Sequence, residues 1–139
     1  MKKWLLLFLV TLVIGVMPIS GCVGREAPTQ IIEDITPQEA FALIQDNQNN
    51  PDFVIIDVRT PEEFAEGHIE GAINLDYYSE TFRDELNKLD RNKIYLIYCR
   101  SGKRSSNALN IMGELGFREA YNVLGGIIEW KAEGLPIVE

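Results

Sequence analysis

Two apolar segments rich in β-branched and aromatic residues limit the folds open to this chain. They are FVIIDV at residues 53–58 and KIYLIY at residues 93–98. Continuous apolar runs of this length are typical of strands that are covered on both faces, as in a parallel sheet. Helical patterns separate the strand-like segments, so the sequence predicts an α/β protein in which a parallel sheet is flanked by helices.

Helix-start signals give the approximate bounds of the other elements. Thr36 before Pro37 is expected to cap one helix, and Thr60 with Glu63 is expected to form a capping box at the start of a short helix that ends at Gly67. Helices are predicted over residues 37–45, 61–66, 79–89, 102–115 and after Gly125-Gly126, with weaker strands over 31–35, 72–75 and 120–124.

The overall composition narrows the class of protein. The chain has 139 residues, which suits one domain, and it is 46% hydrophobic and 24% charged. A core of useful size is therefore expected without a disulfide framework. The formal charge of −8 argues against a nucleic-acid partner, because a protein that binds phosphate backbones should carry a basic face.

The first 21 residues are predicted to be an export signal rather than part of the fold. Lysines at positions 2 and 3 precede an apolar run over residues 4–19, which is short for a membrane span of about 20 residues. The run ends in ISGC at residues 19–22, which resembles the lipobox of bacterial lipoproteins, although Ile19 stands where leucine is commoner. In that family the signal is cut before the cysteine, and its thiol then carries a diacylglycerol.

This resemblance implies a domain held at a membrane surface outside the cytoplasm by a lipidated Cys22. The expected division is a signal peptide at 1–21, a tether at 22–30 and a folded domain at 31–139. An uncleaved anchor helix with an incidental cysteine is the alternative. Loss of residues 1–21 changes the formal charge from −8 to −10, so the acidic body is not expected to adhere to anionic lipid by charge.

The segment YCRSGKRSS at residues 98–106 carries the predicted chemistry. It joins a buried strand to a helix, and ligands of open α/β sheets bind at the carboxyl ends of strands. Unpaired N–H groups at the helix N-terminus and added positive charge should lower the pKa of Cys99 and make its thiolate a nucleophile. The predicted anion-binding loop comprises Arg100, Ser101, Gly102, Lys103 and Arg104.

The two cysteines admit other interpretations. A single disulfide is the default for two cysteines in an exported protein. For Cys99, the alternative to a reactive thiol is a buried cysteine that serves only in packing. A lipidated Cys22 would leave Cys99 as the one free thiol of the mature chain, which predicts a monomer. Cys22, Cys99 and His68 lie too far apart in sequence for a recognised zinc site, so neither metal nor cofactor is expected.

From residue 31 to the C-terminus the chain resembles the rhodanese family of sulfurtransferases. The resemblance lies in DVR at 57–59 with EF at 63–64, GHI at 67–69, GA at 71–72 and Asn74, in the CRSGKR loop at 99–104, and in VLGG at 123–126 with Trp130 and GLP at 134–136. It implies a three-layer fold with a five-stranded parallel sheet. It also implies a ping-pong reaction, in which Cys99 takes the outer sulfur of a donor such as thiosulfate and passes it to a thiol or to cyanide.

The resemblance also bears on the residues around the loop. Six residues from cysteine to terminal cation fit sulfur substrates in this family, whereas related phosphatases and arsenate reductases have a loop one residue longer. Asp57 and Arg59 are interpreted as a charge pair that orients the loop rather than reacts. His68 is interpreted as structural, and the acids at 62, 63 and 66 as a solvated helix face.

Three functions are therefore open. The favoured one is a membrane-anchored, extracytoplasmic sulfurtransferase with a small sulfur-containing anion as donor and a thiol or protein as acceptor. The second is a rhodanese-like binding, redox or sulfur-carrier module without significant turnover. The third is a phosphatase or arsenate reductase, against which the six-residue loop counts.

Overall fold

The strands lie in one sheet with every ladder parallel. The computed structural model describes residues 21, 24 and 26–139, so residues 1–20 and Cys22, on which the signal and lipid predictions depend, lie outside the described residues. The strands are β1 (Ile31–Ile35), β2 (Phe53–Asp57), β3 (Ile73–Asn74), β4 (Ile94–Tyr98) and β5 (Glu119–Val123). Their order across the sheet is β1-β5-β4-β2-β3, which confirms the five-stranded parallel sheet.

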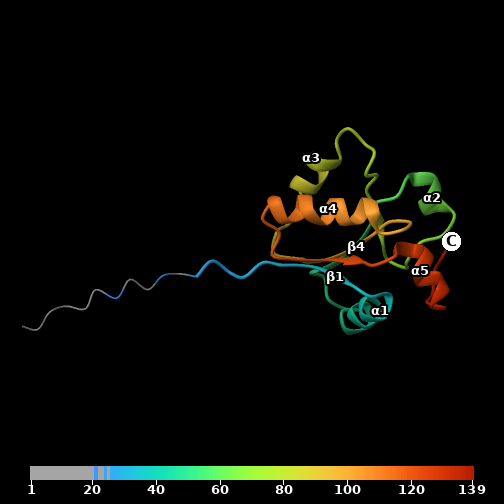
Figure 1. Ribbon diagram of the computed structural model, residues 1–139, viewed down its shortest axis with the longest axis horizontal. Helices are drawn as coiled ribbons and strands as arrows, with labels where there is room; N and C mark the ends of the chain where they lie inside the picture. The colour runs from blue at the N-terminus through green and yellow to red at the C-terminus, as the bar shows by residue number, and fades with distance from the viewer. Residues whose placement is uncertain (1–20, 22–23, 25) are drawn as a thin grey trace, which may run out of the picture.

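Helices cover both faces of this sheet and complete the three layers (Figure 1). They are α1 (Pro37–Asp46), α2 (Pro61–Ala65), α3 (Phe82–Asn87), α4 (Lys103–Glu114) and α5 (Gly126–Ala132). One face packs against α3 and α4, and the other packs against α1 and α5. Alternate residues of β4 divide between them: Tyr95 and Ile97 point to the first face, and Leu96 and Tyr98 point to the second.

The predicted helix starts are confirmed at α1 and α2. Thr36 accepts from the backbone N–H of Glu39, whose carboxylate accepts from the N–H of Thr36 at 2.8 Å. Thr60 and Glu63 form the same reciprocal pair, at 3.3 and 3.0 Å. Each box satisfies two N–H groups that the first turn of a helix leaves unpaired, so each local sequence is sufficient to start its helix.

The helix predicted over residues 79–89 is shorter than expected. Its regular part is α3, and turns occupy the residues before it. Asp76 accepts from the N–H of Tyr78, and Ser79 accepts from the N–H of Thr81. Side-chain bonds of this kind offer the backbone an alternative to the helix, so the helix begins only at Phe82. Phe82 and Leu86 are buried in the core.

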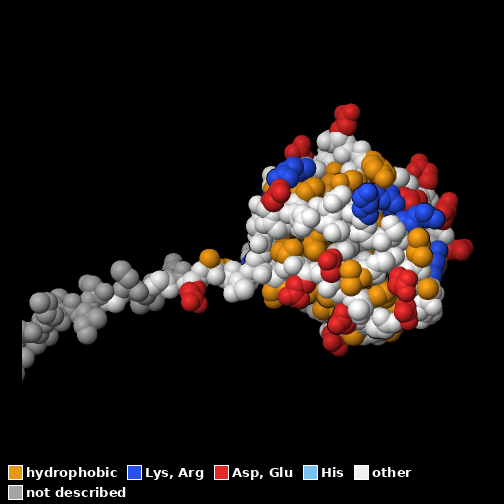
Figure 2. All heavy atoms as spheres, in the orientation of Figure 1, with side chains coloured by type: hydrophobic (Ala, Val, Ile, Leu, Met, Phe, Trp, Pro, Cys, Tyr) orange, Lys and Arg blue, Asp and Glu red, His pale blue; other side chains and the backbone are white. Residues whose placement is uncertain are grey.

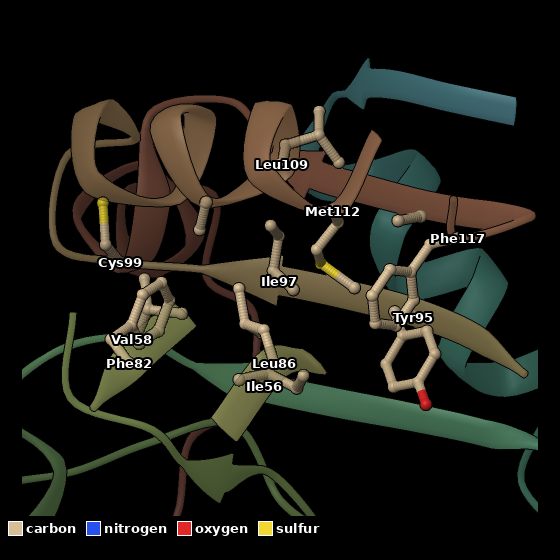
Figure 3. Close-up of a cluster of buried hydrophobic side chains, with 12 residues drawn as sticks. Ile56, Val58, Phe82, Leu86, Tyr95, Ile97, Cys99, Leu109, Met112 and Phe117 are labelled. Carbon is tan, nitrogen blue, oxygen red and sulfur yellow. The ribbon is translucent and has the colours of Figure 1, made fainter. Parts of the chain in front are cut away.

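This arrangement places the cysteine segment at the carboxyl edge of a central strand. β4 lies between β5 and β2, and Cys99 follows its last residue directly. Figure 3 shows Cys99 at the end of the strand with its sulfur turned towards the helix that follows. The side chain is only 1% exposed and packs in the same core cluster as Val58, Phe82 and Ala108.

Candidate active site

The loop after β4 closes around the sulfur of Cys99. The backbone N–H of Gly102 donates to Sγ at 3.1 Å, and the hydroxyl of Ser105 donates to it at 3.3 Å. Gly102 has φ 98°, in the left-handed region, and it directly precedes the first residue of α4. That conformation is easy only for glycine, and it turns the chain sharply enough for the N-terminus of the helix to face the strand end.

Two opposing effects set the acidity of this thiol. Burial raises the pKa of Cys99, because an ion in a poorly solvated site is disfavoured. Hydrogen bonds from the hydroxyl of Ser105 and from the backbone N–H groups of Ser105, Gly102 and Ser101 outweigh burial, so the pKa lies below its usual range. The result favours a thiolate, which is the nucleophilic form of cysteine.

The predicted cations of the loop occupy two different environments. Arg100 and Lys103 are exposed to solvent. Arg104 is largely covered, with a side chain 15% exposed. Figure 2 shows Lys and Arg side chains gathered over the end of α4 where the loop enters it, on a surface otherwise rich in acidic groups. The donors that touch Sγ are neutral N–H and O–H groups, so hydrogen bonding contributes directly to holding the sulfur.

Glu63 pairs with Arg104, which corrects its assignment to a solvated helix face. Its two carboxylate oxygens accept from Nη1 and Nη2 of Arg104 at 2.8 and 2.9 Å. This bidentate contact lowers the pKa of Glu63 to about 2. Since Glu63 also caps α2, one carboxylate joins the start of α2 to the first turn of α4.

Asp57 and Arg59 form a buried ion pair, and their contacts show which segments it orders. Arg59 donates to both carboxylate oxygens of Asp57 at 2.7–3.0 Å and to the backbone carbonyl of Gly67 at 2.7 Å. Its guanidinium lies 5.8 Å from the ring centroid of Tyr98, the residue before Cys99. The pair therefore fixes the segment after α2 and packs beneath the strand end.

Glycines of the turn before α5 allow a second support for the loop. The N–H groups of Ile127 and Ile128 donate to the carbonyl oxygens of Cys99 and Arg100 at 2.9 and 3.1 Å. A Cβ atom on Gly126 would lie 2.5 Å from both of those oxygens. This approach requires glycine, and it occupies the loop carbonyls so that the loop N–H groups are left to face the sulfur.

His68 lies outside this cluster of groups. Its Nδ1 is 2.9 Å from the carbonyl oxygen of Phe64, its ring stacks on that of Phe64, and its backbone bridges to Val138. These contacts support the structural interpretation. Across residues 26–139 no group of three or more His, Cys, Asp or Glu side chains is placed to hold a metal ion.

A cavity in the described part lies away from this site. It has a volume of ≈ 510 Å³ and lies between α1, β2 and α5, with Phe41, Phe53 and Trp130 in its lining. Cys99 packs in the core of the opposite sheet face, so the cavity and the reactive thiol are separate features. None of the described helices has both the length and the apolar character needed to cross a membrane.

Sequence reasoning missed two residues that shape the site. Ser105 lies in the predicted motif, but a hydroxyl in the first turn of a helix gives no sign that it donates back to the cysteine. Glu63 was expected to face solvent, because its partner, Arg104, lies 41 residues away in the sequence. A capping-box glutamate close to a predicted anion loop was the available signal, although it does not identify Arg104 as the partner.

Comparisons with known proteins agree on one family. The model of the rhodanese-like domain matches residues 30–133. A curated protein named sulfurtransferase, from Allochromatium vinosum, is 36% identical over 100 residues, covering 72% of this chain and 92% of that protein. A tRNA uridine(34) hydroxylase from Pectobacterium carotovorum is 39% identical over 99 residues, or 64% of this chain, but the match spans only 27% of the hydroxylase.

Solved structures give the same result. A rhodanese-related protein from Thermoplasma volcanium superposes with a TM-score of 0.63 and is 31% identical, covering 76% of this chain and 97% of that one. A rhodanese-like domain protein from Staphylococcus aureus superposes with a TM-score of 0.60 at 34% identity, covering 77% and 99%.

Removal of the Ser105 hydroxyl should raise the pKa of Cys99. In Ser105→Ala, burial of the thiol remains while one donor to its thiolate is lost, so the balance moves towards the thiol. The pH at which alkylation by iodoacetamide reaches half its maximal rate should move upwards. Ser106→Ala, on the next residue, is the matched control and should keep the wild-type midpoint. An unchanged midpoint in Ser105→Ala would contradict the assigned role.

Replacement of Gly126 by alanine should disturb the loop as well as the turn. Its Cβ would meet the Cys99 and Arg100 carbonyl oxygens, in addition to the strain of φ +60°. Gly116→Ala is the control, because that site has φ +83° and open space around it. Strain alone should cost about 1–2 kcal/mol in urea unfolding. Gly126→Ala should lose more than the control and should also slow alkylation of Cys99.

Proposed function

The chain belongs to the rhodanese-like domain family of sulfurtransferases, and on that basis we propose that it transfers sulfane sulfur through a persulfide on Cys99. The observation that carries the proposal is the sulfur itself, which accepts hydrogen bonds from Gly102 and Ser105 at the carboxyl end of a central strand. A set of donors that stabilises a thiolate also stabilises the terminal sulfur anion of a persulfide, because both place one negative charge on a sulfur atom.

The reaction has two steps, and thiosulfate is the first donor to test. In the first, the Cys99 thiolate attacks the outer sulfur of thiosulfate, the S–S bond of the donor breaks, and sulfite leaves with the bonding electron pair. In the second, cyanide or a thiolate attacks the outer sulfur of the persulfide, and the electron pair returns to Cys99 as thiolate. Neither step requires a metal or an external oxidant. The proposed partners of a monomer are therefore a sulfane-sulfur donor, with thiosulfate as the small anion to test first, and a thiol or protein acceptor.

A sulfur-carrier role is the second candidate, and the surface around the loop favours a protein acceptor. Two of the four large hydrophobic residues that are most exposed in the described part contact the loop: Tyr78 and Ile128. The ring of Tyr78 contacts Arg104, and the N–H of Ile128 bonds to Arg100. Apolar groups exposed beside a reactive site are typical of protein-docking surfaces. Rapid transfer to cyanide would favour the enzyme, and transfer limited to a protein thiol would favour the carrier.

Intact-mass measurement tests the persulfide. The purified chain, incubated with thiosulfate or an organic persulfide, should gain the mass of one sulfur atom, and cyanide should remove it with release of thiocyanate. Cys99→Ser is the control and should gain nothing. Absence of added sulfur on Cys99 with every donor tried would refute the proposed function.

We also propose that Cys22 carries a lipid that anchors the domain outside the cytoplasm. The support is the ISGC segment at the end of the apolar run, together with a body that becomes more acidic when the signal is removed. Protein extracted from bacterial membranes should have the mass of a chain that begins at Cys22 with acyl groups attached. Cys22→Ala should move the protein out of the membrane fraction. Retention of the unprocessed N-terminus would favour the anchor-helix alternative.

A further inference from the structure

Arg104 is the cation of the loop that is most shielded from solvent, and its charge is already neutralised. Both terminal nitrogens of the Arg104 guanidinium bind the Glu63 carboxylate. The guanidinium carbon, Cζ, lies 5.3 Å from the ring centroid of Tyr78. A bidentate pair of this kind uses the two parallel donors with which arginine binds oxyanions. Arg104 in this arrangement does not present that pair of donors to a substrate.

Glu63 is held in this position from the other side as well. Its Oε2 accepts from the backbone N–H of Thr60 at 3.0 Å and from Nη1 of Arg104 at 2.8 Å. The Glu63 side chain is 26% exposed, and the capping box holds it at the start of α2. Swinging Arg104 towards an anion at Cys99 would therefore break an ion pair in which one partner is anchored to a helix.

The charges near the sulfur determine which donors suit it. With Cys99 as thiolate, Cys99, Arg104 and Glu63 together carry one net negative charge. Thiosulfate adds two more negative charges, and its reaction ends with a persulfide anion and sulfite dianion in the same space. An organic persulfide in the form R–S–SH adds none: the thiolate attacks its outer sulfur, R–S⁻ leaves, and the proton stays on the sulfur transferred to Cys99.

The other two cations of the loop do not offset this difference in charge between the two donors. Arg100 and Lys103 are exposed, so water and salt screen their attraction for a dianion. The groups that contact the sulfur are the Gly102 N–H and the Ser105 hydroxyl, which match a single charge on one sulfur atom. The inner part of the loop thus provides donors for sulfur but no uncommitted cation for a sulfonate group.

We propose that Glu63 is a specificity-determining residue, which neutralises Arg104 and so makes the site prefer organic persulfides over thiosulfate as sulfur donors. Glu63 acts through Arg104 and is a positioning residue rather than a catalytic one. The inference rests on the proposed sulfur transfer and deepens it by naming the class of donor. The six-residue loop already disfavours phosphate and arsenate as substrates. Neutralisation of Arg104 by Glu63 would further disfavour the sulfonate group of thiosulfate.

Glu63→Gln is the variant that tests this role. Glutamine also completes a capping box, so the start of α2 is retained while the negative charge is removed. Arg104 then regains a net charge for a dianion. The KM for thiosulfate should fall about tenfold, equivalent to ~1.4 kcal/mol of binding, with kcat changed much less. Any loss of loop support in this variant should act on both donors alike, so the ratio of kcat/KM for thiosulfate to that for an organic persulfide should rise about tenfold.

Glu62→Gln is the matched control. It removes the same charge from the neighbouring exposed residue of α2, and Glu62 is not the partner of Arg104. In the control, kcat and KM should be unchanged with both thiosulfate and the organic persulfide. Thermal unfolding should show that both variants are folded. A second variant, Glu63→Gln combined with Arg104→Gln, should lose the gain for thiosulfate, because the freed cation is then absent.

The wild-type chain supplies a measurement that does not depend on any variant. Its kcat/KM with an organic persulfide should exceed that with thiosulfate by at least about tenfold. Equal or better use of thiosulfate would overturn the inference while leaving the sulfur transfer intact, as would an unchanged thiosulfate KM in folded Glu63→Gln. Failure of every donor to add sulfur to Cys99 would instead refute the proposed function itself.

Discussion

The site depends on the hydrogen bonds by which α5 holds the carbonyl oxygens of Cys99 and Arg100. A loop of this length has as many C=O groups as N–H groups, and both kinds require partners when they are buried. The N–H groups of Ile127 and Ile128 supply partners for two of the carbonyls. Because those oxygens are engaged with α5, the N–H groups of Ser101, Gly102 and Ser105 are free to stabilise the sulfur. The absence of a side chain at Gly126 is what permits this approach.

A second set of contacts supports the loop from the opposite side. The β2–α2 connection is organised by the Asp57–Arg59 pair, and the same connection carries the Thr60–Glu63 capping box. Glu63 then reaches the first turn of α4 through Arg104. The loop is thus held between α5 and α2, two short helices with little intrinsic stability, so its geometry is set by tertiary contacts rather than by helix propensity.

Local sequence was sufficient for elements whose determinants lie within a few residues of one another. The T-P-x-E pattern predicted the starts of α1 and α2, and the apolar runs predicted β2 and β4 to within a residue or two. Cys99 and Gly102 could be chosen from the loop because a strand end, a cysteine and a glycine are adjacent. The Glu63–Arg104 pair could not, since it joins residues 41 apart that meet only when α2 and α4 pack at the same sheet edge. Five strand segments could be predicted from the pattern, but the bounds of β3 could not, because it has only two residues and a weak pattern of its own.

The use of neutral donors has a consequence for how the thiolate responds to its surroundings. The sequence predicted that unpaired N–H groups and cations would together lower the pKa of Cys99, and attraction by exposed cations weakens as salt screens them. Hydrogen bonds from Ser105 and Gly102 act within the protein on a sulfur that is 1% exposed, where solvent ions have little access. Burial raises the pKa and the donors lower it, so both effects have their origin in the packing of one loop. The pKa of Cys99 is therefore lowered by contacts within the folded loop, and the exposed cations are left to influence which anions approach it.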